Sequence, residues 1–326
     1  MNAAARTPSW SALQTAAVLL LCRLTLFFCC DQPYTAAYAK GMLAAALTEA
    51  VLLLPLAIFR RFCRFPPAMM WIYRVFSLIS AAFLAAEGFR LLHALHSAQP
   101  ALFAAMFLLT LLFTVSRPQA ATARAAVILL VTVSTALLLL PVSGIRTANP
   151  VSLHMPGSVS GAFFREFRCS PELALLPVLL SHPKKQEQYA PHALAVWLIG
   201  RLAVLPGLVL FGTMQNGRLT RGAGSPFFLM LAGAPLSDAV RTDGFWMLFA
   251  AGSAVLCVSF FLQLALPPSR RPVRALLTVM LLFTGLTWLC ISADYRGTGL
   301  GIAALLLGAL LPGVLLPISR TRRQKS

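Results

Sequence analysis

The sequence has few charged residues, and acidic residues are the scarcest of them. Of its 326 residues, 11% are charged and only 9 are Asp or Glu, whereas 59% are hydrophobic. A soluble domain typically carries about 25% charged residues, so this composition excludes an ordinary soluble domain. We expect an integral membrane protein whose main partner is the lipid bilayer and which has little mass outside it.

The shortage of acidic residues leaves a formal net charge of +18. Such an excess could indicate a nucleic-acid partner, but the basic residues lie in short clusters between apolar runs. They form no basic face or stripe of the kind that follows a nucleic-acid backbone. The sequence therefore predicts no nucleic-acid partner, and it places these clusters in the loops between membrane spans.

Several motifs of enzymes and metalloproteins are missing. The sequence contains no nucleotide-binding loop, no His-rich cluster and no Ser/His/Asp set in a recognisable context. Its seven cysteines lie in or beside apolar runs without metal-ligand spacing, so we expect packing roles for them. We predict that the chain is not an enzyme and needs neither a cofactor nor a metal ion.

Apolar runs of spanning length occur ten times. They lie at about 10–30, 41–59, 68–95, 98–116, 124–143, 161–181, 191–213, 244–266, 273–293 and 299–318. The first follows a single Arg and lacks a small-residue cleavage site, so it is expected to be a retained span. With both termini cytoplasmic, 15 of the 27 basic residues fall on the cytoplasmic side and 6 on the outer side. This bias predicts a multi-pass membrane protein with that orientation.

Ten spans divide into two sets of five, and the second set is then inverted relative to the first. We expect an all-α fold with repeats at about 8–143 and 161–318, followed by a basic cytoplasmic tail at 319–326. Inverted repeats of this kind bind substrates between discontinuous helices near the middle of the membrane. The sixth span would be the counterpart of the first, so discontinuous first and sixth helices are predicted.

The sixth span carries its own signal for a break. Three charges precede Ser170 and Pro171, which suit the N-cap and first position of a new helix. The apolar run from 171 to 181 is about half as long as a membrane span requires. We therefore predict a half-helix that begins near mid-membrane at Cys169–Pro171. An ordinary proline kink repaired by neighbouring helices is the alternative.

Charged residues within predicted spans are candidates for a binding site, because burying them in lipid is costly. Arg23 has no acid nearby on its own span, and Glu172 begins the half-helix. We hypothesise that these two interact across the site. Alternatively, Arg23 reaches the outer surface and Glu172 neutralises Arg165 or Arg168.

Two further pairs of charges lie within spans. Glu87 and Arg90 are three residues apart on the third span, and so lie on one helix face. They form either a local ion pair or a contact with substrate or a proton. Glu49 and Arg201 either line a cavity or satisfy other buried charges, and the second interpretation is favoured.

Three segments carry a resemblance to one known family. They are the start Pro8–Gln14 at the entry to the first span, the aromatic-then-acid pattern of the sixth span with Glu172 at the acid position, and the proline-led segment 226–246 with Arg241-Thr242-Asp243. Together these segments resemble the spore germination permease family, the membrane B subunits of nutrient germinant receptors within the amino acid–polyamine–organocation superfamily. The first span departs from the family, because it has Arg23 where a small residue is usual.

The resemblance implies a receptor subunit that binds a small nutrient, such as an amino acid, and triggers spore germination. Its location would be the bacterial cell membrane or the spore inner membrane, and its partners would be an A-type subunit and a lipoprotein C-type subunit. The candidate ligand-binding residues are Arg23, Thr25, Glu87, Cys169, Ser170 and Glu172. A proton- or cation-coupled amino acid transporter and a structural subunit without a ligand are the alternatives.

Overall fold

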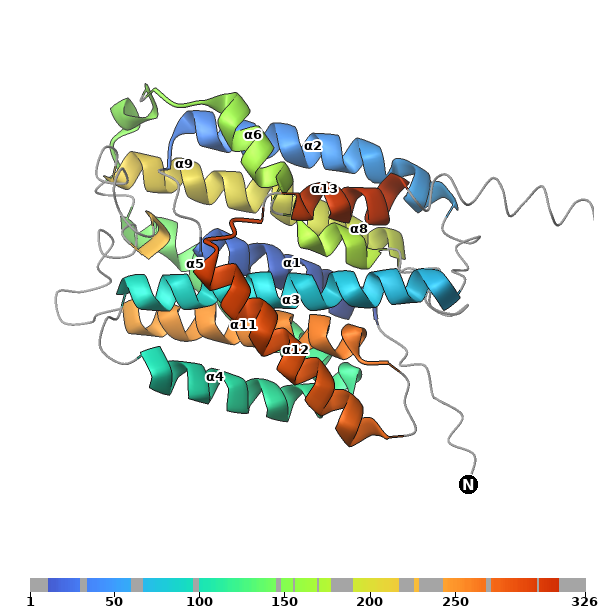
Figure 1. Ribbon diagram of the computed structural model, residues 1–326. Helices are drawn as coiled ribbons and strands as arrows, with labels where there is room; N and C mark the ends of the chain where they lie inside the picture. The colour runs from blue at the N-terminus through green and yellow to red at the C-terminus, as the bar shows by residue number, and fades with distance from the viewer. Residues whose placement is uncertain are drawn as a thin grey trace, which may run out of the picture.

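The computed structural model describes residues 11–29, 34–59, 67–95, 100–144, 148–154, 156–168, 170–176, 190–216, 226–228, 243–267, 271–297 and 299–310. These residues form helices and no β-strand (Figure 1). The all-α prediction is therefore confirmed for the described part of the chain.

The α-helices are α1 (Ala12–Phe28), α2 (Ala36–Phe59), α3 (Pro67–Leu95), α4 (Pro100–Val115), α5 (Gln119–Gly144), α6 (Val159–Arg168), α8 (Ala190–Ile199), α9 (Leu205–Asn216), α11 (Asp243–Ala265), α12 (Pro272–Ser292) and α13 (Leu300–Leu305). Two 3₁₀-helices, η2 (Pro150–His154) and η3 (Pro171–Ala174), and two π-helices, η4 (Gly200–Val204) and η6 (Leu306–Leu310), complete them.

Six helical segments in the described residues are long and apolar enough to cross a membrane. They are Ala36–Leu54, Met70–His93, Gln119–Leu138, Leu194–Gln215, Trp246–Ala265 and Pro272–Ser292. Helices α1 and α4 contain shorter apolar stretches, Leu13–Phe28 and Ala104–Val115. These helices identify a multi-pass membrane protein compatible with a lipid bilayer. The count of ten spans and their arrangement as two inverted repeats stay predictions.

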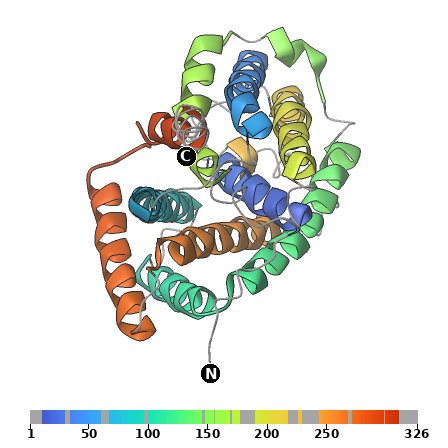
Figure 2. The same cartoon turned by 90° about the vertical axis from the view of Figure 1, so that its right-hand side faces the viewer.

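Helix α1 lies at the centre of the bundle, with α2, α3, α5, α8 and α11 around it (Figure 2). Its start is fixed by a capping box, in which Ser11 and Gln14 bond each other's backbone N–H groups. The helix is continuous to Phe28, so the prediction of a discontinuous first helix is wrong. Leucines dominate its middle and favour helix, and the Thr25 hydroxyl bonds the Leu21 carbonyl within the regular ladder.

The predicted break in the sixth segment is present. Helix α6 ends at Arg168, and η3 begins at Pro171. Proline has no N–H for a continuing helix and disfavours helical geometry in the residue before it, here Ser170 with φ −122° and ψ 55°. The predicted N-cap bond from Ser170 is absent. Of the predicted half-helix at 171–181, the structure describes only residues 171–176.

Glycines allow two close approaches that hold the broken segment in place. A Cβ atom on Gly41 of α2 would lie 2.5 Å from Ala162 Cβ of α6. A Cβ on Gly308 of η6 would lie 2.2 Å from the Leu173 carbonyl oxygen of η3. Because the backbones touch directly, α6 and η3 are each fixed against a neighbouring helix.

Candidate functional site: a buried arginine and glutamate cluster

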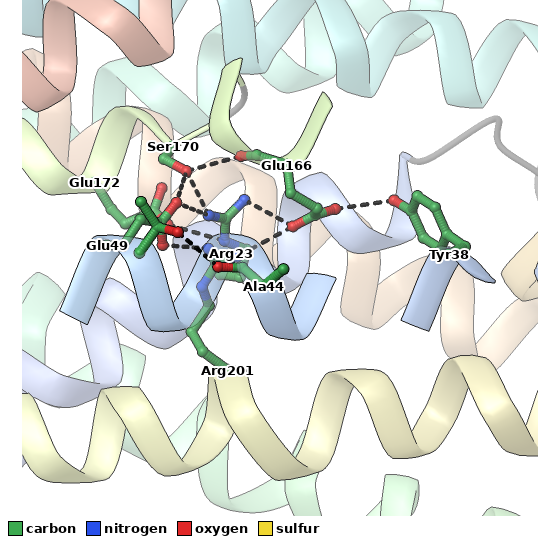
Figure 3. A network of polar contacts seen from close by, with 9 residues as sticks. Arg23, Tyr38, Ala44, Glu49, Glu166, Ser170, Glu172 and Arg201 are labelled. Atoms are coloured by element: carbon green, nitrogen blue, oxygen red, sulfur yellow. Dashed lines mark hydrogen bonds and ion pairs between the residues drawn. The ribbon is translucent and has the colours of Figure 1, made fainter. Parts of the chain in front are cut away.

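Five charged side chains from five elements meet inside the bundle, beside the break (Figure 3). They are Arg23 of α1, Glu49 of α2, Glu166 of α6, Glu172 of η3 and Arg201 of η4. None is more than 8% exposed, and Glu49 and Glu172 are completely buried. We call these five residues the charge cluster.

Arg23 is the central member of the charge cluster. Its Nε lies 2.9 Å from Glu172 Oε1, its Nη1 lies 3.4 Å from Glu166 Oε2 and its Nη2 lies 3.6 Å from Glu49 Oε1. Nη2 also donates a hydrogen bond of 2.6 Å to Ser170 Oγ. One guanidinium group therefore contacts all three carboxylates, and the hypothesised contact between Arg23 and Glu172 is confirmed.

Arg201 supports the cluster from the other side. Its Nη2 pairs with Glu49 Oε2, and its Nη1 donates to Glu166 Oε2 over 3.1 Å. Its guanidinium carbon lies 5.8 Å from the centre of the Trp197 ring. The favoured interpretation of Glu49 and Arg201, that each satisfies another buried charge, is therefore confirmed.

Arg201 lies within the π-turn η4, in which the Leu205 N–H bonds the Gly200 carbonyl five residues back. Such turns carry one residue more than an ordinary helical turn and occur frequently at functional sites. Gly200 faces Leu20 of α1, whose Cδ2 would lie 2.4 Å from an added Cβ. The close approach between these elements brings Arg201 beside the residues of α1.

Two hydroxyl groups add hydrogen bonds to the cluster. Tyr38 Oη donates to Glu166 Oε1 over 2.9 Å. Ser170 Oγ lies 2.6 Å from Glu49 Oε1 and 2.9 Å from the Glu166 carbonyl oxygen, and its single proton serves one of them at a time. Ser170 thus contributes its hydroxyl to the cluster instead of capping η3.

Glu172 has the fewest partners of the three acids. Its contact with Arg23 has the distance of an ion pair, yet neither carboxylate oxygen has a hydrogen-bond partner among the described residues. We take the distance as evidence of charge pairing and the missing hydrogen bonds as evidence of poor alignment. Glu172 is therefore buried with its charge only partly compensated.

The charge cluster has a formal charge of −1 when all five residues are ionised, because three glutamates face two arginines. Its members are all buried, and Glu166 is the most exposed of them at 8%. An uncompensated charge in such surroundings is costly. The arrangement is suited to accept one more positive charge.

Of the predicted site residues, Arg23, Ser170 and Glu172 come together, whereas Thr25 and Glu87 lie elsewhere. Thr25 bonds the Leu21 carbonyl and lies 3.7 Å from Cys257 Sγ of α11. Glu87 pairs with Arg90, which also donates to the Cys290 and Tyr295 carbonyls. Cys169 is outside the described residues.

Sequence reasoning missed Glu166 and Tyr38 as members of the site. Glu166 was one of the three charges before the break, and its position within a predicted span was the available signal. Tyr38 gave no signal, because a tyrosine near the start of a span is common at membrane interfaces.

Comparison with known proteins finds no match to a protein-family model and no match to a curated protein. A functional assignment therefore has to come from the chemistry of the charge cluster.

Proposed function

We propose that this chain is a permease-like membrane subunit that binds a small nutrient with an ammonium group, such as an amino acid, at the charge cluster. One observation carries the proposal: the cluster, buried inside the helical bundle beside the break between α6 and η3, has one more carboxylate than guanidinium group. A ligand's ammonium group would supply the positive charge that the cluster lacks.

Binding requires the cluster to open, because its members are buried. A ligand that contacts the open arrangement better than the closed one would shift the population toward it. A receptor subunit uses such a shift as its signal. On this proposal, the break between α6 and η3 is the place where the change begins.

The direct test is binding to the purified protein in lipid nanodiscs, with each standard amino acid examined by thermal stabilisation and calorimetry. A ligand is expected to raise the unfolding temperature of the wild type. Glu172→Gln removes the surplus carboxylate and should weaken binding at least tenfold. The control Asp294→Asn alters a carboxylate that is 68% exposed and should bind normally. If no amino acid binds the wild type, the proposal is wrong.

The role in spore germination follows from the resemblance to the B subunits of nutrient germinant receptors. On that proposal, the chain works with an A-type subunit and a lipoprotein C-type subunit in the spore inner membrane. Co-purification of both subunits with a tagged copy of this chain would support it. Isolation of the chain without either, from spores that respond to nutrients, would contradict it.

A proton-coupled amino acid transporter is the second candidate, and the surplus buried carboxylate of Glu172 favours it, since coupled transporters use such groups. Uptake into proteoliposomes separates the candidates. A receptor subunit binds the labelled amino acid without accumulating it, whereas a transporter accumulates it when a proton gradient is applied. Absence of both binding and uptake would favour a structural subunit.

A further inference from the structure

The closed charge cluster holds one more carboxylate than it can pair. Among the buried side chains, Glu49, Glu166 and Glu172 carry three negative charges, and Arg23 and Arg201 carry two positive ones. The half-buried Arg165 of α6 also acts on Glu166, but it lies outside this buried set. Arginine keeps its proton in proteins, so the positive side is fixed. A group that is buried without a full partner is expected to become neutral. In the absence of a ligand, a proton on one glutamate is the simplest way to neutralise the cluster.

The hydrogen bonds identify which glutamate takes the proton. Glu166 contacts both arginines and accepts from Tyr38. Glu49 contacts both arginines and lies within hydrogen-bonding distance of the Ser170 hydroxyl. Each of these two carboxylates therefore has at least three polar partners.

Glu172 differs on each count. In the part of the chain that the structure describes, its one ion pair is with Arg23 Nε, and both of its oxygens lack a hydrogen-bond partner there although the side chain is completely buried. Figure 3 shows its carboxylate directed into the cluster, next to that of Glu49. Two acids side by side, of which one has few partners, are the arrangement in which a single proton is retained.

We propose that the closed, ligand-free protein carries one proton on the Glu172 carboxyl group, and that a cationic nutrient displaces it. On binding, the O–H bond of Glu172 breaks, the proton leaves to solvent and the resulting carboxylate pairs with the ligand's ammonium group. The displacement of the proton by a ligand rests on the proposed function. The protonation of Glu172 in the ligand-free protein does not depend on it.

The groups around Glu172 offer no better site for the proton. Helix α1 contributes Arg23 and the Cys22 thiol, and a thiol is neutral in its protonated form. Glu49 faces Glu172 from α2 and Arg201 faces it from η4, while Glu166 of α6 shares Arg23 with it. Elements α13 and η6, which pack on η3, contain only apolar residues and glycine.

A metal cation is a poorer occupant than a proton. The described residues contain no group of three or more His, Cys, Asp or Glu side chains arranged to hold a metal ion. Two guanidinium groups also lie against the carboxylates and would repel a divalent ion. A proton needs no such coordination sphere, so it fits the closed cluster.

Infrared difference spectroscopy of the ligand-free protein in lipid tests the first half of the proposal. A protonated carboxyl group has a C=O stretch well separated from the carboxylate bands, and the band shifts when the O–H is exchanged for deuterium. We expect this band in the wild type and its loss in Glu172→Gln. The matched control Asp294→Asn, which alters an exposed carboxylate outside the charge cluster, should retain it. Absence from the wild type, or persistence in folded Glu172→Gln, would overturn the assignment.

Proton release on ligand binding tests the second half. Each standard amino acid is added to the protein in weakly buffered nanodiscs with a pH indicator, and about one proton per bound ligand is expected from the wild type. Glu172→Gln should release less than a tenth of this amount at saturating ligand. Binding without release would overturn the exchange. If no amino acid binds, the proposed function is wrong. The infrared band still shows whether Glu172 is protonated in the ligand-free protein.

Discussion

At the scale of single residues, the members of the charge cluster depend on one another. Each arginine contacts at least two glutamates, so removing one charge leaves its partners buried and poorly compensated. The loss of one partner from a buried pair is much more damaging than the loss of both. The stability of the cluster is therefore a property of the set, and it is measured by coupling between substitutions.

The pair formed by Glu49 and Arg201 gives a direct prediction. Glu49→Gln removes the ion pair between Arg201 Nη2 and Glu49 Oε2. This loss should lower the free energy of unfolding by about 3–5 kcal/mol. The double variant Glu49→Gln/Arg201→Gln should lose less than the sum of the single variants, because the contact between Glu49 and Arg201 is then lost only once. Denaturant unfolding in mixed micelles measures all three.

The control for this prediction is an exposed pair. Arg296 Nε lies 3.0 Å from Asp294 Oδ1, and both side chains are more than half exposed. Arg296→Gln should change the free energy of unfolding by no more than about 1 kcal/mol. Additive losses for Glu49 and Arg201 would show that the buried contact is energetically unimportant.

At the scale of helices, the interrupted sixth segment depends on the glycines beside it. An added methyl group at Gly308 would collide with the backbone of η3 at Leu173, and a backbone carbonyl cannot move aside as a side chain does. Overpacking of this kind typically costs about 1–3 kcal/mol. The π-helix η6 therefore acts as a close-fitting support for η3.

Gly308→Ala tests this support against Gly285→Ala of α12, where nothing lies within 4 Å of an added Cβ. The first substitution should destabilise the protein by about 1–3 kcal/mol and weaken ligand binding, because η3 carries Glu172. The second should be neutral or stabilise by up to about 1 kcal/mol through helix propensity. Both variants are compared by thermal unfolding, and equal behaviour would contradict the packing argument.

The helices and the break could be predicted from the sequence, but the contacts between them could not. Hydrophobic runs identify spans locally, and Ser170-Pro171 interrupts one of them by backbone chemistry alone. The continuity of α1 was missed, because the break was expected from the hypothesis of an inverted repeat. The local sequence at residues 19–26 favours an uninterrupted helix. The meeting of Glu166 with Arg23 and Arg201 depends on packing between distant segments, which no local pattern encodes.

At the scale of the whole molecule, large apolar side chains cover the outer faces of several helices. Leu281 of α12 is 75% exposed, Leu138 of α5 is 74% exposed and Leu109 of α4 is 67% exposed. Five charged residues instead lie buried together in the charge cluster within the bundle. This distribution is the reverse of that in a soluble protein and fits a molecule surrounded by lipid.

Spin labels at single introduced cysteines, in a background without the native cysteines, test where the lipid lies. A label at Leu281→Cys should be relaxed strongly by oxygen, which concentrates in lipid, and weakly by a water-soluble nickel chelate. A label at Arg296→Cys, beyond the end of α12, should show the opposite preference. Strong relaxation of both labels by the chelate would contradict burial of α12 in the membrane.

The orientation of the chain in the membrane stays a prediction that rests on the distribution of basic residues. Fusing green fluorescent protein to the C-terminus should give fluorescent cells, because that protein folds in the bacterial cytoplasm and fails after export in unfolded form. Fusing alkaline phosphatase to the same position should give no activity. The reverse pattern would place the C-terminus outside.

The π-turn at Gly200–Val204 limits how this stretch of polypeptide can change in length. Deleting a single residue from it would restore an ordinary helix and rotate Leu194–Ile199 by about 100° relative to Leu205–Asn216. Either Trp197 would then leave the core or the residues after the turn would lose their contacts with α2. A related sequence that keeps an arginine at this place is therefore expected to keep the additional residue, and an alignment that inserts a gap there is expected to be misaligned.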